Sequence, residues 1–307
     1  MVKSSEATPV VKDDLPIQEY LSRQKTTVDQ HLAGFLPPID AHPEVIHQAM
    51  HYSIFAGGKR IRPILALATG EALEGDPDKL IFLACALEMI HTYSLIHDDL
   101  PAMDDDDYRR GQLSTHKKFG DGIAILTGNA LLTQAFQLLA QTPLASDLII
   151  SVVGEICEAI GTTRGMLGGQ AMDLTSQGKP ISHQELQQIH AAKTGALISA
   201  SVSSAALLSG ASEENYARLN AYGSRIGLAF QIVDDILDAK DPSGKSAESQ
   251  GKDELHQKAT YPSLHGLETS QEMATELVEE AIGQLDFLGS RGEILKGLGR
   301  FISVRRI

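Results

Sequence analysis

The sequence has few cysteines, no leader pattern and no long uninterrupted apolar run. Its 307 residues include two cysteines, Cys85 and Cys157, and both lie in apolar helical segments, which predicts buried thiols and no disulfide. No run approaches the roughly 18 apolar residues that a membrane span needs, so no span is expected. Residues 1–15 lack the basic start and apolar core of a signal peptide, which favours a cytoplasmic protein.

Basic residues are also scarce. The chain has 26 Lys and Arg against 40 Asp and Glu, a formal net charge of −14. This balance argues against nucleic acid and anionic membrane surfaces as partners. No linker, internal repeat or low-complexity tract divides the sequence. We therefore expect a single catalytic domain over residues 16–307, preceded by a disordered tail over residues 1–15.

Apolar residues recur at helical spacing almost throughout. Leu80, Leu83 and Leu87 are three or four residues apart, and sustained strand-like alternation is missing. Ser182 is a predicted helix N-cap, with Glu185 in capping-box spacing. Further helical segments are expected at 122–141, 147–163 and 183–209. The predicted fold class is all-α, a bundle of roughly ten helices around a deep central cleft.

Two aspartate-rich clusters end apolar helical runs. The first has aspartate at positions 98, 99 and 104–107, and the second is Asp234-Asp235-Ile236-Leu237-Asp238. Pro101 interrupts the first helix, so Asp98 and Asp104 can converge across a bend. In the second cluster the first and last aspartates share a helix face. Repulsion between such carboxylates is relieved by a bound cation.

The ligand types favour magnesium. Oxygen ligands without a nearby His or Cys in a metal-ligand pattern select magnesium or calcium over zinc. Neither cluster has the ligand spacing and mid-loop glycine of a calcium-binding EF-hand. Magnesium binds through one or two carboxylates together with substrate phosphates, so a phosphate-containing ligand is predicted. An isolated acidic run of this kind would instead indicate a solvated surface.

Several cations lie beside these clusters in an otherwise acidic chain. Arginine binds phosphate through its planar fork and lysine through a compact charge, so these residues support a phosphate ligand. The alternatives are a solvated basic patch at a helix start and simple charge balancing beside the aspartates. The cations are Lys59, Arg60 and Arg62, then Arg109 and Arg110, and Lys193.

A helical cleft that is apolar at depth and charged at its mouth suits a diphosphate with a hydrocarbon tail. With these features the chain resembles the trans-isoprenyl diphosphate synthases, most closely the bacterial farnesyl diphosphate synthases, over about residues 30–305. The motifs that carry the resemblance are Gly58–Pro63, His91–Gly111, Gly169–Leu174, Lys193–Ala196, Phe230–Asp238 and Lys258–Pro262.

The resemblance implies a prenyltransferase that condenses isopentenyl diphosphate head to tail with dimethylallyl and geranyl diphosphate, giving farnesyl diphosphate. It also implies a homodimer and three magnesium ions per active site, with manganese as a substitute. The implied metal ligands are Asp98, Asp99, Asp104, Asp234, Asp235 and Asp238, with Asp105 in support. The implied isopentenyl diphosphate site is Gly58, Lys59, Arg62, His91 and Arg110. The implied allylic diphosphate site is Arg109, Lys193, Thr194, Gln231 and Lys258.

The implied chemistry is ionisation of the allylic carbon–oxygen bond, attack by the isopentenyl double bond, and loss of a proton to the departed diphosphate. Dipoles near Lys193, Thr194 and Gln231, the implied catalytic residues, stabilise the carbocation while water is excluded. Residues 241–251 and 300–306 are candidate closing segments. Many relatives carry a lysine where this chain has Ala247-Glu248; either a neighbouring lysine, Lys245 or Lys252, replaces it or closure is weaker.

Product length is the remaining question. Tyr93 lies about 7.5 Å before Asp98 along the helix axis, and the resemblance implies that its ring stops growth at fifteen carbons, with small Ser94 beside it. The alternative for Tyr93 is an ordinary core residue, and for His91 a core or capping histidine. Alternative activities are a geranylgeranyl diphosphate synthase, a class I terpene cyclase and a non-catalytic modulatory subunit. The second aspartate cluster disfavours the cyclase, and the intact aspartates disfavour the modulatory subunit.

Overall fold

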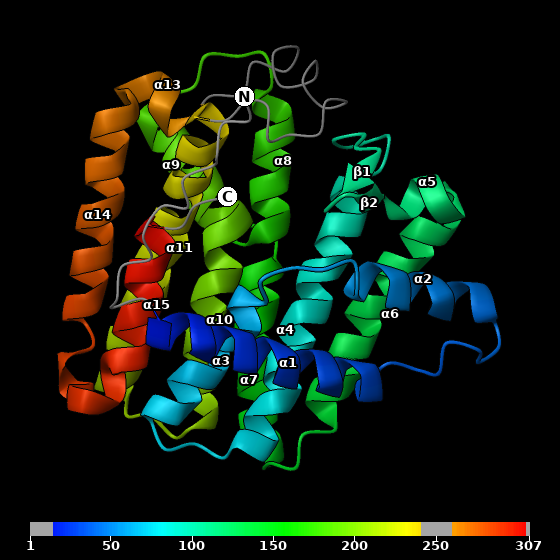
Figure 1. Ribbon diagram of the computed structural model, residues 1–307, viewed down its shortest axis with the longest axis horizontal. Helices are drawn as coiled ribbons and strands as arrows, with labels where there is room; N and C mark the ends of the chain where they lie inside the picture. The colour runs from blue at the N-terminus through cyan, green and yellow to red at the C-terminus, as the bar shows by residue number, and fades with distance from the viewer. Residues whose placement is uncertain (1–14, 241–259, 305–307) are drawn as a thin grey trace, which may run out of the picture.

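Long helices packed side by side make up the protein, whose computed structural model describes residues 15–240 and 260–304 (Figure 1). The elements of the first half are α1 (Leu15–Phe35), α2 (Glu44–Ile54), α3 (Ile61–Ala72), α4 (Pro77–Asp98), β1 (Tyr108–Arg109), β2 (Gln112–Leu113), α5 (Thr115–Phe119), α6 (Asp121–Ala140) and α7 (Ser146–Ile160). Those of the second half are α8 (Met166–Ser176), α9 (His183–His190), η2 (Ala191–Gly195), α10 (Ala196–Leu208), α11 (Glu213–Lys240), α13 (Tyr261–His265), α14 (Leu267–Gly283), η3 (Asp286–Gly292) and α15 (Glu293–Val304).

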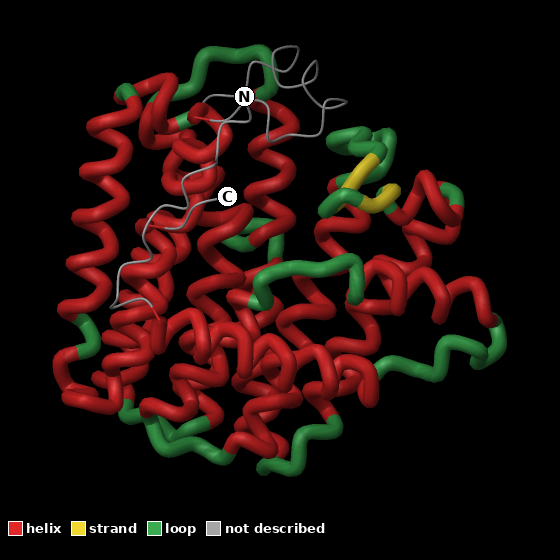
Figure 2. The backbone as a smooth tube through the Cα atoms, in the orientation of Figure 1, coloured by secondary structure: helices red, strands yellow, loops and turns green. Residues whose placement is uncertain are grey.

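The predicted all-α class is confirmed. Helices account for most of the trace in Figure 2, and the β1–β2 hairpin stands at one edge. The described residues contain more helical elements than the roughly ten expected, because short helices such as α5 and α13 join the long ones. The predictions for residues 1–14 and 241–251, for Lys258 and for the C-terminal residues from 305 on concern positions outside the described residues.

Helix α4 is buried along most of its length and carries the first aspartate cluster at its end. Asp76 caps its start by accepting a hydrogen bond from the Asp78 amide at 3.1 Å, and Pro77 occupies the first turn, where its missing N–H is not needed. The helix packs against α3 and α6 through fully buried residues such as Leu83 and Leu87. It ends at Asp98, shortly before Pro101.

The segment from α9 to α10 holds a π-helical turn. The predicted capping box of Ser182 and Glu185 is confirmed at the start of α9. The single helix expected at 183–209 is interrupted by η2, a type of insertion that often marks functional sites. A Cβ atom on Gly227 would lie 2.7 Å from the Gly195 Cα atom, so glycine allows η2 to touch α11 directly. The π-helical turn that carries Lys193 is thereby held against α11.

The expectation for one of the two cysteines is wrong. Cys85 is buried, but Cys157 is exposed on α7, because an amphipathic helix against the bundle leaves one face in solvent. Three described helical stretches are also long and apolar enough to cross a membrane, by length and composition: Pro77–Asp98, Asp121–Ala140 and His183–Leu208. The expectation counted only uninterrupted runs, whereas a few polar residues leave the mean hydropathy high. Inside the fold these windows are 78%, 39% and 67% buried.

A buried ion-pair network joins the N-terminal helices. Arg60 is 2% exposed and precedes α3 with a left-handed φ of 53°. Its guanidinium donates to Asp29 of α1, to Glu88 of α4 and to the Ile54 carbonyl, each at 2.7 Å. Burial alone would lower the pKa of Arg60, but Glu88 and Asp29 raise it overall. The network fixes the loop between α2 and α3 on α4.

We predict that Glu88→Gln lowers the free energy of unfolding by about 3 kcal/mol, because it leaves a buried guanidinium without one of its counter-charges. Glu280→Gln, which breaks the solvent-exposed ion pair with Arg225, is the matched control and should cost less than about 1 kcal/mol. Urea unfolding followed by circular dichroism measures both. Equal losses in the two variants would contradict a structural role for the Arg60 network.

Candidate active site

The first aspartate cluster folds back on the end of α4. The Asp104 amide donates to the Asp98 carbonyl at 2.8 Å, and the Asp106 amide donates to the Asp99 carbonyl at 3.2 Å. The Asp105 amide donates to the Leu100 carbonyl at 3.1 Å. These bonds close the bend that Pro101 begins. Asp98 and Asp104 are therefore brought to the same place, as the sequence predicts.

The Asp98 carboxylate lies between α4, α8 and η2. Gln170 of α8 donates its side-chain amide to Asp98 at 2.5 Å. Burial raises the pKa of Asp98 to about 6, against the lowering influence of nearby Lys193, and Asp104 adds to the rise. Because the charged form of Asp98 is disfavoured here, a cation at this position would be bound favourably.

The neighbouring Asp99 faces the protein instead. Its carboxylate is 2% exposed and accepts hydrogen bonds from Arg109 Nε at 2.9 and 3.3 Å, with a further bond from Nη2 of the same guanidinium. Burial raises the pKa of Asp99 to about 6 even though Arg109 lowers it. Arg109 also lies 3.3 Å from Asp106. The predicted metal ligand Asp99 and the predicted substrate ligand Arg109 thus contact each other.

In the second aspartate cluster, as in the first, one buried aspartate contacts neighbouring protein groups. Asp235 is 6% exposed and accepts a hydrogen bond from the Tyr261 amide at 3.0 Å and from Gln231 at 3.3 Å. Burial raises the pKa of Asp235 to about 6. Asp238 is exposed, and the charge of Asp234 acts on Arg62. Asp235 therefore joins α11 to α13, while Asp234 belongs to the cationic side of the site.

Lys193, Thr194 and Gln231 line one cavity of about 380 Å³ together with Asp173, Asp235 and Asp238. The Lys193 ammonium lies 2.6 Å from the Asp173 carboxylate of α8. Burial alone would lower the pKa of Lys193, but Asp173, Asp98 and Asp104 raise it overall, so the ammonium stays charged. The structure brings together the three predicted catalytic residues and two members of the second aspartate cluster, Asp235 and Asp238.

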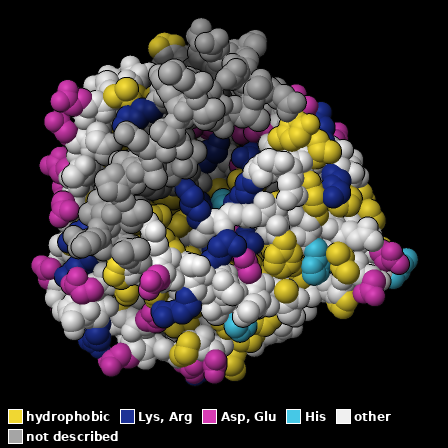
Figure 3. Space-filling model, in the orientation of Figure 1, with side chains coloured by type: hydrophobic (Ala, Val, Ile, Leu, Met, Phe, Trp, Pro, Cys, Tyr) yellow, Lys and Arg dark blue, Asp and Glu magenta, His cyan; other side chains and the backbone are white. Residues whose placement is uncertain are grey.

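A separate cationic cavity of about 610 Å³ is lined by every residue predicted for isopentenyl diphosphate. These residues are Gly58, Lys59, Arg62, His91 and Arg110. The rest of the lining is Ala56, Gly57, Arg60, Ile61, Glu88 and Phe230. The φ of Gly58 is +126°, a conformation that L side chains rarely adopt, which explains the glycine. In Figure 3 Lys and Arg side chains gather around the central hollow of the visible face, with acidic side chains near its upper rim.

Electrostatics in this cavity favour an anion. Burial lowers the pKa of Arg62 to about 10, so the guanidinium remains charged at neutral pH. The Arg62 Nε atom is buried and has no hydrogen-bond partner within residues 15–240 and 260–304. Burial, with Arg62 and Arg110 close by, holds the pKa of His91 well below its usual range, so this imidazole is neutral. A bound anion would supply the partner that Arg62 Nε lacks.

Tyr93 and Ser94 lie on the buried side of α4. Tyr93 is 4% exposed, and its ring meets His97 edge to face at a centroid distance of 5.7 Å. Burial raises the pKa of Tyr93 to about 12. Ser94 donates to the His91 carbonyl at 2.8 Å. Tyr93 therefore belongs to the packed interior one turn below the aspartates.

Sequence reasoning gave no role to two polar residues of the site, Gln170 and Asp173. Both belong to a motif that the sequence analysis quoted, and they are three residues apart on α8. That spacing puts them on one helix face, which was the available signal. A Cβ atom on Gly169 would overlap the Lys193 backbone, so α8 and η2 are in contact. Lys258 lies outside the described residues.

Comparisons with known proteins identify the family. Residues 43–289 match the family described as polyprenyl synthetase. A geranylgeranyl diphosphate synthase of Cyanophora paradoxa is 46% identical over 92% of this chain and 94% of its own length. A farnesyl diphosphate synthase of Geobacillus stearothermophilus is 42% identical over 87% and 90%, respectively. The crystal structure of a putative farnesyl-diphosphate synthase from Marinomonas sp. MED121 is 41% identical, with a TM-score of 0.80 over 94% of this chain and 98% of that one.

A second crystal structure, an FPP/GFPP synthase of Zymomonas mobilis, is 34% identical and has a TM-score of 0.85 over 95% of this chain and all of that one. These likenesses extend over the aspartate clusters and both cavities described above. The names of these relatives state prenyl products of different lengths, geranylgeranyl and farnesyl diphosphate. The chain therefore belongs to the polyprenyl synthetase family and is a prenyltransferase that makes polyprenyl diphosphates.

Proposed function

We propose that this prenyltransferase makes farnesyl diphosphate by adding isopentenyl diphosphate to dimethylallyl and then to geranyl diphosphate. The observation that carries the proposal is the cationic cavity, in which Arg62 has a buried, unpartnered Nε atom beside a neutral His91. A diphosphate supplies the oxygen acceptors that this cavity lacks. The aspartates that end α4 and α11 account for a second, metal-bound diphosphate.

The donor set fits magnesium. Asp98, Asp104 and Asp234 offer carboxylate oxygens, and the raised pKa of Asp98 reflects a buried position that a cation would stabilise. Magnesium held there would neutralise the charge that develops on the diphosphate leaving group. Manganese, which accepts the same oxygen ligands, is expected to substitute. Asp99 and Asp235, whose carboxylates accept hydrogen bonds from Arg109 and from the Tyr261 amide, would support these ligands through those contacts.

The remaining residues position the substrates. Lys193, kept charged by Asp173, would bind the allylic diphosphate. Arg109, whose guanidinium is held by the Asp99 carboxylate, would bind the same group. Thr194 and Gln231 line the same cavity, where their dipoles can face the allylic cation after the carbon–oxygen bond breaks. The isopentenyl diphosphate held by Lys59, Arg62 and Arg110 then attacks. The proton that is lost goes to the departed diphosphate, so no protein base is required.

Tyr93 supports a fifteen-carbon product, because its bulky ring occupies the interior one turn below the aspartates. A geranylgeranyl product is the second candidate, since relatives of about equal similarity carry that name. The aspartates of both clusters are present, which disfavours a non-catalytic modulatory subunit and a terpene cyclase.

A homodimer in the cytoplasm is part of the proposal. Large apolar side chains are exposed on two neighbouring helices, namely Ile125 and Leu126 on α6 and Ile150 on α7, with exposures of 44%, 52% and 69%. We propose that these side chains contact a second copy of the chain.

Incubation of the purified chain with dimethylallyl and isopentenyl diphosphates tests this proposal. Farnesol is expected after dephosphorylation; a cyclic hydrocarbon would indicate a cyclase, and no product would indicate a modulatory subunit. A chelator should abolish activity and magnesium should restore it. Asp98→Ala or Asp234→Ala should slow turnover by several orders of magnitude with an unchanged helical signal, because the leaving group loses its main stabilisation. Near-normal turnover in either variant would rule out the metal role.

The two diphosphate sites can be separated by kinetics. Lys59→Ala and Arg62→Ala should each raise KM for isopentenyl diphosphate about 10- to 100-fold, the equivalent of one charge-assisted hydrogen bond. Arg109→Ala should mainly impair the allylic substrate. Lys79→Ala, which removes a half-buried lysine paired with Asp76, is the matched control and should change neither constant. If all three site variants affected both substrates equally, the assignment of the two cavities would be wrong.

The product-length role of Tyr93 is tested by Tyr93→Ala. Removal of the ring should shift the product from fifteen toward twenty carbons, because a longer tail no longer meets a steric barrier. Tyr93→Phe keeps the bulk and should keep the fifteen-carbon product. Chromatography of the dephosphorylated alcohols measures both, and circular dichroism checks that the alanine variant is folded. An unchanged distribution in Tyr93→Ala would show that another wall sets the length.

A further inference from the structure

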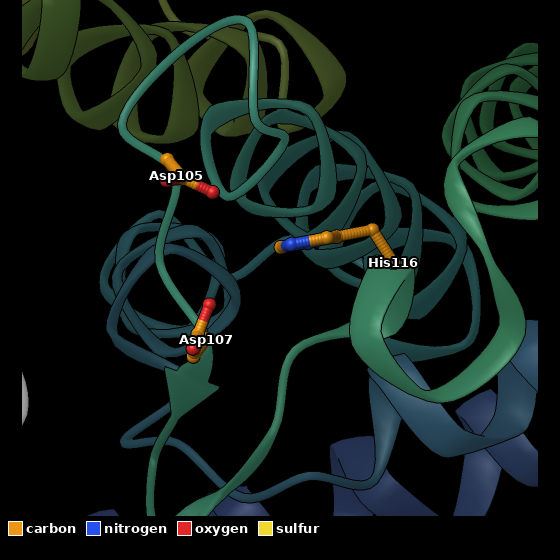
Figure 4. Close-up of side chains that lie close together, drawn as sticks. All are labelled: Asp105, Asp107 and His116. Carbon is orange, nitrogen blue, oxygen red and sulfur yellow. The ribbon is translucent and has the colours of Figure 1, made fainter.

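Three potential metal ligands meet at the base of the β1–β2 hairpin, beside the first aspartate cluster. They are Asp105, Asp107 and His116, and one ligand atom from each lies within 4.8 Å of the others. Figure 4 shows the His116 ring directed between the two carboxylates. His116 comes from α5, and the aspartates come from the loop before β1. The proposed substrate site leaves Asp107 and His116 without a role.

His116 is the unusual member of this group. It is 4% exposed, and its Nε2 atom is buried with no hydrogen-bond partner among the described residues. Its other ring nitrogen, Nδ1, lies 3.0 Å from the Ser114 hydroxyl. If Nδ1 carries the proton and donates it to Ser114, the Nε2 lone pair faces the carboxylates. Ring nitrogens that bind metal are commonly oriented by such a bond from the other nitrogen.

The fold holds these ligands in a fixed frame. Tyr108 pairs with Leu113 and Arg109 pairs with Gln112 across a tight turn at Arg110 and Gly111, both with positive φ. The Ser114 amide donates to the Asp107 carbonyl at 2.8 Å, so α5 begins directly opposite Asp107. Thr115 is tied to α2 by a 2.9 Å hydrogen bond to Ser53. The imidazole is thus positioned before any ion binds.

We propose that Asp105, Asp107 and His116 bind one divalent transition-metal ion of the zinc or manganese class. One imidazole nitrogen and two carboxylate oxygens suit such ions, whereas magnesium prefers an all-oxygen shell. The Lys117 ammonium, 2.8 Å from Asp107, is the positive charge that the ion would replace. Water would complete the coordination. This site needs no diphosphate, so it does not rest on the proposed product.

The ion would act as a clamp on the hairpin. The hairpin carries Arg109, which holds Asp99, and Arg110, which reaches the cationic cavity. Asp105 and Asp107 lie on the loop that enters the hairpin, and His116 lies on the helix that leaves it. A metal bond across these two segments would close the base of the hairpin and limit the movement of both arginines.

The test measures metal content instead of catalysis. Untagged, chelator-stripped full-length protein carrying Asp98→Asn and Asp234→Asn, which remove the proposed magnesium ligands, is dialysed against Zn²⁺ without any diphosphate. One zinc per chain is expected by elemental analysis. His116→Gln and Asp107→Asn, added separately, should each weaken binding at least about tenfold, whereas Asp121→Asn, which removes an exposed aspartate near Lys117, should not.

Asp107 is exposed, so its variant keeps the test valid if His116→Gln does not fold. Zinc retained by both triad variants, or no zinc bound by the parent, would overturn the proposal. Complete displacement of zinc by excess magnesium would also overturn it, because it would indicate a non-selective acidic cluster. Loss of prenyl transfer in the background variant bears only on the proposed function, since metal content is measured without substrate.

Discussion

The cationic cavity depends on the buried network centred on Arg60. This arginine connects α1, the end of α2 and α4, and its left-handed backbone begins α3. Lys59 and Arg62 flank it in the sequence and line the cavity. Because Arg60 is neutralised by Asp29 and Glu88, it can be buried while its neighbours keep their charges for a ligand. One arginine of the motif is thus structural, whereas Lys59 and Arg62 line the cavity and are the residues to which the proposed function gives substrate binding.

The carboxylates are divided in a similar way. Asp99 and Asp235 are turned inward and hold Arg109 and the start of α13. Asp98, Asp104 and Asp234 are left for the cleft. Each cluster therefore combines aspartates that build the site with aspartates that the proposed function assigns to the metal. Burial disfavours the charged forms of Asp98, Asp99 and Asp235 alike, so the site is poised to accept positive charge.

Much of this arrangement follows from local sequence pattern. The all-α class, the capping box at Ser182 and the bend after Pro101 depend on spacing and backbone chemistry, which a sequence displays directly. The grouping of Gly58, Lys59, Arg62, His91 and Arg110 followed from the family resemblance, and the structure places them around one cavity. The direction in which an individual aspartate points depends on which helix packs beside it. Periodicity therefore did not separate Asp99 from Asp98, or Asp235 from Asp234.

Other features depended on tertiary contacts and were missed. Asp173 becomes the partner of Lys193 only because α8 lies against η2. His116 approaches Asp105 and Asp107 only because the hairpin reverses the chain between them. Cys157 is exposed because its helix faces outward, which an apolar segment does not reveal. The polar residues within α4 also hid how apolar that helix is on average.

The glycine contacts around η2 have a mechanical consequence. Gly169 and Gly195 bring η2 against α8 and α11 without intervening side chains, so there is no compliant layer between them. The Lys193 backbone cannot shift relative to α8 or α11 unless the backbones separate. The backbone of Lys193 therefore moves together with α8 and α11, and its ammonium is held by the ion pair with Asp173.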